Sequence, residues 1–295
     1  MNSKQMTYFL AVVDHGTISA AAKALGIAQP SLSAQMQALE EDLGVSLMQR
    51  GGRQVQLTEA GQLLYRRACT ILSLTDQTVR EVQAAADGAR GVVSLGTISS
   101  CSTILLEARL PAFRAAHPQV SFALVEGNTY HLMEKLRRGD IELSMMRTPF
   151  VEEGLDVHIL AEEPLVLAAR PVFFAGLAPG AVEMAQLATL PLIYYRRYEH
   201  LLAAALERRG LTATTYCKND DARTCLLWAQ AGLGVALVPR SVVAMLPAST
   251  LEQRAIAAPE TLTRVALVRA KDRQLSHAAD TFWTFMTAGG ENIKK

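Results

Sequence analysis

A run of small hydroxyl and thiol side chains, Ser99-Ser100-Cys101-Ser102-Thr103, follows directly on the apolar segment 92–97. The apolar segment is typical of a buried strand, and the run after it is typical of the first turn of a helix. Free N–H groups and hydroxyls at such a helix start can bind a carboxylate. Plain capping is the alternative, because capping uses the same residues. Ser99, Ser100 and Ser102 are therefore candidate ligand-binding residues.

A second candidate for recognition chemistry is the helix predicted after the turn at 26–29. Its inward stripe consists of apolar residues at helical spacing: Leu32, Met36 and Leu39. At 100° per residue, the opposite face and its flanks carry small, uncharged residues: Pro30, Ala34 and Gln37, with Ser31 and Ser33 beside them. Glutamine can pair with adenine, and serine can bind bases or phosphates, so this face suits a major groove. A solvated surface helix is the alternative.

Two shorter helices are expected before this one. Apolar residues at 6–13 predict an amphipathic helix behind a possible Ser3 cap. The next helix, 18–25, has Thr17 as its N-cap and Gly26 as its stop. A pair of helices joined by a glycine turn is the arrangement of a helix-turn-helix.

A hairpin is expected after the third helix. The segments 47–50 and 53–57 flank the Gly51-Gly52 turn and predict two short strands, which would form a wing. Arg50 and Arg53 at its tip are spaced to reach a sugar-phosphate backbone or a minor groove. Two solvated arginines on a tight turn are the alternative.

A long helix is expected from Thr58, its N-cap, to about residue 88. Residues with alternating spacings of four and three form a seam along it: Leu64, Ala68, Ile71, Thr75, Thr78, Val82 and Ala85. The seam fits either a contact between two copies of the helix or packing on its own domain. The segment 87–91 has the glycines and charge of a hinge, which places a domain boundary near residue 90.

Beyond this hinge, segments typical of strands alternate with segments typical of helices. Strands are expected at 92–97, 120–125, 141–146, 165–169, 192–194, 214–218, 235–238 and 265–268, and helices at 105–116, 130–138, 201–209, 222–230 and 276–286. The alternation predicts an α/β fold with a parallel-rich sheet in two similar lobes. In such folds ligands bind outside the carboxyl ends of the strands.

The composition of the whole chain excludes several classes of protein. Half of the 295 residues are hydrophobic and 19% are charged, so the chain can bury several cores. Neither the net charge of +1 nor the charge of the first 90 residues indicates nucleic-acid binding, which must rest on local arrangement. No signal peptide or membrane-spanning segment is evident, which favours a cytoplasmic protein.

No residue pattern in the chain indicates an enzyme or a metal site. The motifs G-x-S-x-G, H-E-x-x-H, G-x-G-x-x-G and the P-loop are absent, and the six histidines form no pattern. The four cysteines lack C-x-x-C spacing and are expected to be reduced. We therefore expect no catalytic residue, no metal and no cofactor.

The N-terminal string A-A-x-x-L-G-I-A-Q-P-S-L-S-x-Q-x-x-x-L-E-x-x-L-G-x-x-L-x-x-R, followed by L-T-E-A-G, resembles the signature of LysR-type transcriptional regulators. The resemblance implies base or groove contacts from Gln29, Pro30, Ser31 and Ser33, and backbone contacts from Arg50 and Arg53. Two positions depart from the family's common residues. Ala34 stands where arginine is frequent, which puts a direct guanine contact in doubt. Met48 stands where phenylalanine is frequent, a packing change of small cost.

The resemblance also implies a domain plan. A winged helix-turn-helix would occupy 1–58, a linker and dimerisation helix with a hinge 59–90, and a periplasmic-binding-protein-like effector domain 91–295. Its first lobe would comprise about 91–162 and 269–295, and its second lobe about 163–268. Residues at strand ends would face the cleft between the lobes: Asn128, Thr129, Arg147, Tyr194, Tyr195 and Arg196.

Alternatives remain for several of these residues. Arg147 would either bind a carboxylate in two-pronged fashion or form an ion pair with Glu152 or Glu153. The tyrosines could instead be core residues.

The resulting hypothesis is a regulator of transcription that binds double-stranded DNA and is controlled by a small organic acid. It would act as a homodimer or homotetramer, with RNA polymerase as a partner if it activates. One alternative is a redox-sensing regulator of the same architecture that uses Cys217 and Cys225, which are eight residues apart. Another is a cytoplasmic small-molecule-binding protein.

Overall fold

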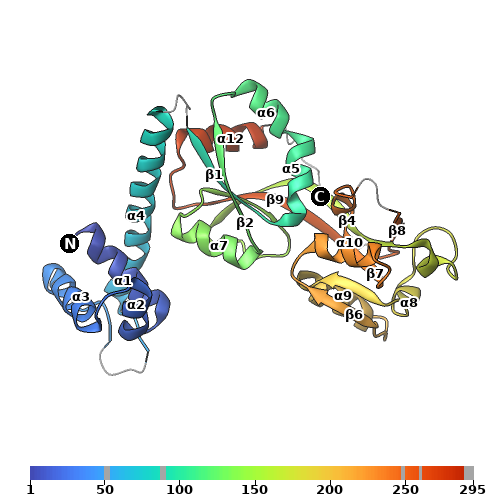
Figure 1. The fold of residues 1–295 in the computed structure, drawn as a ribbon, viewed down its shortest axis with the longest axis horizontal. Helices are drawn as coiled ribbons and strands as arrows, with labels where there is room; N and C mark the ends of the chain where they lie inside the picture. The colour runs from blue at the N-terminus through green and yellow to red at the C-terminus, as the bar shows by residue number, and fades with distance from the viewer. Residues whose placement is uncertain (50–53, 87–90, 247–249, 259–260, 289–295) are drawn as a thin grey trace. The chain divides into compact units, whose positions relative to one another are not determined.

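The computed structural model describes residues 1–49, 54–86, 91–246, 250–258 and 261–288 (Figure 1). The chain divides into two compact units, the first of residues 1–88 with 137–140 and the second of residues 89–136 and 141–295. The tip of the expected wing, with Arg50 and Arg53, and the expected hinge at 87–90 lie outside the described residues.

The N-terminal unit begins with three helices, α1 (Ser3–His15), α2 (Ile18–Leu25) and α3 (Gln29–Leu43). Asn2, not Ser3, caps α1, because its side chain accepts a hydrogen bond from the Gln5 N–H while the Gln5 side chain accepts one from the Asn2 N–H. Thr17 caps α2 as expected. Gly26 ends α2 in the left-handed conformation, which lets the chain turn at once into α3.

The core of this unit joins the three helices to the start of a long helix, α4 (Glu59–Ala86). Its buried members come from α1, α2 and α3, together with Leu47, which follows α3 in the chain. Met48 and Leu57 form an antiparallel bridge, and the Gln49 N–H donates to the Gln56 carbonyl oxygen at 2.8 Å, so the base of the hairpin is formed. Gly61 is required at the start of α4, because a Cβ there would lie 2.1 Å from the Leu47 carbonyl oxygen.

The second unit is built on one sheet whose strands follow the order β2-β1-β3-β9-β4-β7-β5-β6, with β8 paired to β4. The strands are β1 (Val92–Thr97), β2 (Ser121–Glu126), β3 (Leu143–Arg147), β4 (Leu155–Ala169), β5 (Leu192–Tyr195), β6 (Thr215–Asn219), β7 (Val235–Pro239), β8 (Glu252–Ala255) and β9 (Leu262–Ala270). Parallel pairing joins β2, β1 and β3 in one part of the sheet and β6, β5 and β7 in the other. The expected alternation therefore produces two lobes.

The lobes are joined through the two long strands β4 and β9, which pair with each other in antiparallel fashion. Pro164 lies where β4 exchanges partners, with β9 before it and β7 and β8 after it. Proline lacks the N–H that a ladder needs, so it is tolerated at such an exchange. The sequence predicts only residues 165–169 of β4, the part that follows this proline. The boundaries expected near 162 and 269 fall inside these strands.

Helices flank the sheet in both lobes (Figure 1). In the first lobe they are η1 (Ser99–Cys101), α5 (Ser102–Ala108), α6 (Leu110–Ala116), α7 (Thr129–Arg138) and α12 (His277–Thr287). In the second they are η2 (Pro171–Phe174), α8 (Met184–Leu187), η3 (Arg196–Tyr198), α9 (Glu199–Glu207), α10 (Ala222–Gln230) and α11 (Arg240–Val243). The single helix expected at 105–116 is wrong, because the chain breaks at Arg109, two residues before Pro111.

Each lobe has a hydrophobic core of its own, one around β1, β3 and α12 and one around β5, β7 and α10. Among the described helices, none is both long and apolar enough to cross a membrane. In the same part of the chain, no three His, Cys, Asp or Glu side chains are placed together as metal ligands.

Candidate functional site

In the N-terminal unit, α3 is the candidate recognition helix. Leu32, Met36 and Leu39 are buried against α1 and α2, so the inward stripe is the one expected. The outward residues are all exposed: Gln29, Pro30, Ser31, Ser33, Ala34 and Gln37. No side chain caps the N-terminus of α3, where Ala28 is the cap residue. The first turn of α3 therefore presents glutamine and serine side chains to the solvent.

Hydrogen bonds hold the base of the hairpin next to α3. One carboxylate oxygen of Glu40, on α3, accepts from the N–H groups of Leu47 and Met48 at 2.6 and 3.2 Å. The Thr58 hydroxyl donates to the Ser46 carbonyl oxygen at 2.7 Å and accepts from the Gly61 N–H at 3.0 Å. These bonds fix the two ends of the segment that carries Arg50 and Arg53.

The seam expected on α4 divides into two parts. Ala68 is fully buried and Leu64 packs against the core of its own unit, which is the packing alternative. Further along, α4 exposes Ile71, Leu74, Val79 and Val82, and Val82 is 66% exposed. Apolar side chains repeated on one helix and open to solvent are typical of an interface with another chain.

In the second unit, the two lobes meet at η1. This short helix follows β1 and contacts α10 and α11 of the second lobe. Ser100 is fully buried there, Ser99 is also buried, and Asp221 caps the neighbouring helix α10. Ser102 is partly buried. None of the three serines caps η1 or α5 through its side chain, so the capping alternative is wrong.

Arg147 lies at the end of β3 and is fully buried. Its guanidinium donates to the Ser100 carbonyl oxygen at 2.9 Å, to the Thr263 hydroxyl at 2.9 Å and, more weakly, to the Ser100 hydroxyl at 3.4 Å. It also forms an ion pair with Glu163 at 2.7 Å. The alternative of an ion pair with Glu152 or Glu153 is therefore wrong, because β4 brings Glu163 beside β3 through their common neighbour β9.

Glu163 connects this arginine to the second lobe. Its two carboxylate oxygens accept from the Ser241 hydroxyl and the Ser241 N–H, both at 2.7 Å. Ser241 lies on α11, so the buried chain Ser100–Arg147–Glu163–Ser241 crosses from one lobe to the other. Four N–H donations already occupy most of the five donors of Arg147, which leaves it little capacity for a ligand.

A second arginine, Arg197, also joins the lobes, and the sequence did not single it out. From η3 of the second lobe its guanidinium donates to the Thr129 hydroxyl and, at 2.7 Å, to the Pro149 carbonyl oxygen, both in the first lobe. Its Nε is buried without a hydrogen-bond partner, and within the described residues it has no carboxylate partner. Burial lowers the pKa of this guanidinium.

Tyr198, the next residue, is fully buried, and its hydroxyl has no hydrogen-bond partner. Burial raises the pKa of this hydroxyl, which therefore stays neutral. Its ring packs edge-to-face on Tyr195, with centroids 5.7 Å apart. In the sequence, only their position shortly after an apolar strand could have marked Arg197 and Tyr198 as candidate site residues.

The remaining candidates lie around this group. Thr129 is buried, whereas Asn128 is exposed and accepts from the His131 N–H at 2.9 Å, so it caps α7. Tyr195 is buried beside Tyr198. Arg196 is 57% exposed and pairs with Asp220 at 3.1 Å, away from the buried group. The structure thus brings together Ser100, Thr129, Arg147 and Tyr195, with Arg197 and Tyr198.

An exposed ionic group also bridges the lobes. Arg223 on α10 pairs with Glu126 at the end of β2 at 2.6 Å and with Asp221 at 2.7 Å. Two carboxylates therefore share one arginine, which leaves one negative charge in excess.

Of the two cysteines proposed for redox sensing, Cys225 is buried and Cys217 is partly buried, and both are free thiols. Burial raises the pKa of the Cys225 thiol to about 12, and the Asn219 amide donates to its sulfur at 3.2 Å. Burial likewise raises the pKa of Cys101 to about 11. A thiol is reactive as a thiolate, so burial disfavours the reactive form of both Cys225 and Cys101.

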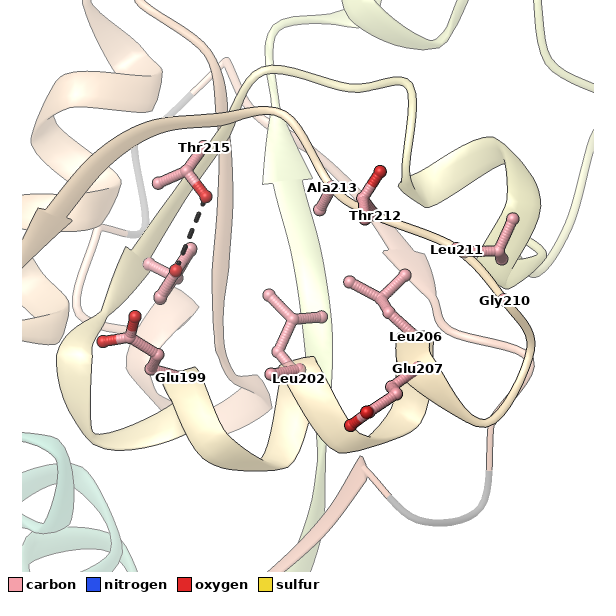
Figure 2. A pocket seen from close by; sticks show the side chains of 11 residues that line it. Glu199, Leu202, Leu206, Glu207, Gly210, Leu211, Thr212, Ala213 and Thr215 are labelled. Carbon is pink, nitrogen blue, oxygen red and sulfur yellow. Dashed lines mark hydrogen bonds between the residues drawn. The ribbon is translucent and has the colours of Figure 1, made fainter.

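A cavity of about 550 Å³ lies apart from the lobe junction, between α9 and the segment 210–215 (Figure 2). Leu202 and Leu206 project from α9 toward it, and the Thr215 hydroxyl lies 3.5 Å from that of Tyr194. Glu199 at its edge already pairs with Lys218. Tyr194 therefore lines this cavity, not the junction, as expected for neighbouring strand residues that face opposite ways.

Comparisons with known proteins agree with this arrangement. The family model described as bacterial regulatory helix-turn-helix protein, lysR family, matches residues 3–62, and that described as LysR substrate binding domain matches residues 86–290. The HTH-type transcriptional regulator BudR of Raoultella terrigena is 32% identical over 251 residues, which cover 82% of this chain and 86% of BudR.

Solved structures of complete regulators resemble the whole chain. The crystal structure of CbnR, a LysR family transcriptional regulator, has a TM-score of 0.62 and 26% identity and covers 97% of this chain and 98% of CbnR. Full-length CbnR in complex with its target DNA has a TM-score of 0.61, with 98% of this chain and 99% of CbnR covered. The chain described here is a LysR-type DNA-binding transcriptional regulator with a winged helix-turn-helix and a two-lobed effector-binding domain.

Proposed function

We propose that a small organic acid, bound where the two lobes meet, controls operator binding or promoter activation by this regulator. The observation that carries the proposal is the pair Arg197 and Tyr198. Arg197 is a partly buried cation whose buried Nε has no hydrogen-bond partner and which has no carboxylate partner among the described residues, and Tyr198 has a fully buried hydroxyl without a partner. Buried polar groups are almost always satisfied in proteins, so two unsatisfied groups on neighbouring, electrostatically interacting residues favour a missing polar partner, and the positive charge of Arg197 favours an anion.

The ligand would be held from both lobes. Arg197 and Tyr198 would bind its carboxylate, with Thr129 and Ser100 as hydrogen-bond donors from the first lobe and Tyr195 as an apolar wall. Arg147 would act through Ser100, whose position it fixes. Ser99, Ser102, Asn128 and Arg196 would lie at the edge of the site. Because Arg197 already contacts Thr129, a ligand at this point would alter how tightly the lobes are held together.

DNA recognition would use the exposed face of α3. Gln29, Pro30, Ser31 and Ser33 would contact base edges or the groove, and Arg50 and Arg53 would contact the backbone. The exposed apolar residues of α4 would join two copies into a dimer, and dimers into a tetramer. Bound to cytoplasmic DNA, an activating form would have RNA polymerase as a further partner. Regulation, not catalysis, is the proposed role.

Operator binding tests the DNA contacts. Gln29→Ala should weaken binding to operator DNA more than binding to random DNA, because base contacts contribute only to the specific complex. Fluorescence anisotropy with both duplexes measures the two affinities. Gln62→Ala on α4, which is also exposed, is the matched control and should change neither. Equal losses on both duplexes would contradict base readout by Gln29.

The response to organic acids tests the effector site. An acid that binds should raise the melting temperature of the full chain, because it binds the folded form. The same acid should change operator affinity by about 5- to 150-fold, the usual range of coupling between two sites. Arg197→Gln should abolish both responses while the free variant still binds operator DNA. An acid response that survives this substitution would place the site elsewhere.

A further inference from the structure

The charges around the lobe junction are almost completely balanced. Arg147 is neutralised by Glu163 at 2.7 Å, and the exposed Arg196 by Asp220 at 3.1 Å. Neither arginine therefore has a charge left for a ligand. A buried ion pair of this kind is satisfied only when both partners stay in place. A ligand that bound Arg147 in place of Glu163 would leave the Glu163 carboxylate buried without its cation.

Arg197 is the exception. Its two hydrogen-bond partners, the Thr129 hydroxyl and the Pro149 carbonyl oxygen, are both uncharged. The other groups that affect its charge are the neutral Tyr198, Tyr195 and Cys101 and the already paired Arg147. Within the described residues, the junction thus offers one partly buried positive charge that is not compensated.

The nearest excess charge has the opposite sign. Arg223 pairs with both Glu126 and Asp221, and Asp221 caps α10, which contacts η1 at the junction. Arg147, Arg196 and Arg223 already have carboxylate partners, so a second negative charge on a ligand would find no second free cation among them and would approach the Asp221 carboxylate. Like charges repel, and because the Asp221 side chain is 30% exposed, water and salt screen part of this repulsion.

We propose that the effector is a monoanion: one carboxylate that pairs with Arg197 and accepts a hydrogen bond from Tyr198, on an otherwise uncharged molecule. This inference rests on the proposed function, because it takes the junction as the effector site. It goes further in assigning the charge of the ligand, and it predicts that the site rejects dicarboxylates.

The test uses pairs of probes with the same shape and different charge. Succinamate and succinate form an aliphatic pair, and 4-carbamoylbenzoate and terephthalate an aromatic pair, each with one and two negative charges. Benzoate and benzamide compare one charge with none. Isothermal titration calorimetry on the full-length chain measures each affinity. In any pair that binds, the monoanion should bind at least about tenfold more tightly than its dianionic or neutral partner.

The variants Arg197→Gln and Arg196→Gln test which arginine pairs with the carboxylate of the ligand. Arg197→Gln should remove monoanion binding and leave the melting temperature unchanged or raised, because it removes a partly buried charge that has no carboxylate partner among the described residues. Arg196→Gln should leave monoanion binding unchanged. Loss of binding in Arg196→Gln but not in Arg197→Gln would overturn the assignment.

The outcomes separate this inference from the function on which it rests. A dianion that binds as tightly as its matched monoanion, with dependence on Arg197, overturns the charge assignment and leaves the effector site in place. Binding that does not depend on Arg197, or no binding of any probe at millimolar concentration, overturns the proposed site and this inference together.

Discussion

Arg147 and Arg197 both lie where the two lobes meet, Arg147 fully buried and Arg197 partly buried, and their surroundings differ in kind. Arg147 has a carboxylate, two hydroxyls and a carbonyl oxygen around it, and its carboxylate partner is itself doubly hydrogen-bonded. Arg197 has only neutral oxygens on two of its nitrogens and nothing on the third. The comparison teaches that burial alone does not mark a binding residue. A satisfied buried charge holds the fold together, and an unsatisfied one is available to a ligand.

The largest expected effect comes from removing the partner of Arg147. Glu163→Gln should destabilise the effector unit by about 3–5 kcal/mol, because it leaves a buried cation uncompensated. Both tryptophans, Trp228 and Trp283, lie in this unit, so fluorescence during urea unfolding reports on it. The neighbouring Glu162→Gln, which breaks a more exposed pair with Arg264, is the matched control and should cost about 1 kcal/mol at most. Similar losses in the two variants would mean that Arg147 does not need its partner.

A smaller effect of opposite sign is expected at Tyr198. Tyr198→Phe removes a buried hydroxyl that has no partner, so stability should be unchanged or rise by about 1 kcal/mol, while binding of the organic acid weakens. Thermal unfolding with and without the acid measures both quantities. Tyr194→Phe is the control, because its hydroxyl lies 3.5 Å from that of Thr215 and away from the junction. A clear loss of stability in Tyr198→Phe would show that its hydroxyl is satisfied in solution.

The smallest effect is expected at the exposed bridge between the lobes. Arg223→Gln breaks its pairs with Glu126 and Asp221, which water and salt screen, so the loss of stability should be about 0–1 kcal/mol. The same urea titration measures it, and raising the salt concentration should reduce the difference from the unchanged chain. A loss as large as that of Glu163→Gln would remove the distinction between buried and exposed bridges.

The N-terminal unit could be predicted closely from the sequence. The residues that end α2 and begin α3 act on their immediate neighbours, and the inward stripe of α3 follows from helical spacing alone. The choice of Asn2 over Ser3 as the first cap is the exception, and it depended on the reciprocal bond to Gln5. In the second unit most strands and helices were predicted for the same local reasons. The predictions failed near two prolines. Only the part of β4 after Pro164 was predicted, and a single helix was predicted where the chain forms α5 and then α6, which contains Pro111.

The candidate effector site was only partly predictable. The strand end before η1 marked Ser100, because ligands bind outside the carboxyl ends of the strands in such folds, and the family resemblance marked Thr129, Arg147 and Tyr195 at other strand ends. The choice between Arg196 and Arg197 could not be made from adjacent arginines, since successive residues of a 3₁₀ turn point about 120° apart. Which of the two faces inward depends on how η3 packs against the first lobe.

By itself, then, the sequence determined the helix-turn-helix, the alternating α/β pattern and the presence of cations and hydroxyls at strand ends, because these features depend on residues close together in the chain. The tertiary structure alone decided which charges are neutralised. Glu163 reaches Arg147 because two long strands cross between the lobes, and Thr129 reaches Arg197 from 68 residues away. Charge compensation in a buried site depends on distances in space, and these distances are set by the packing of elements that the chain itself keeps apart.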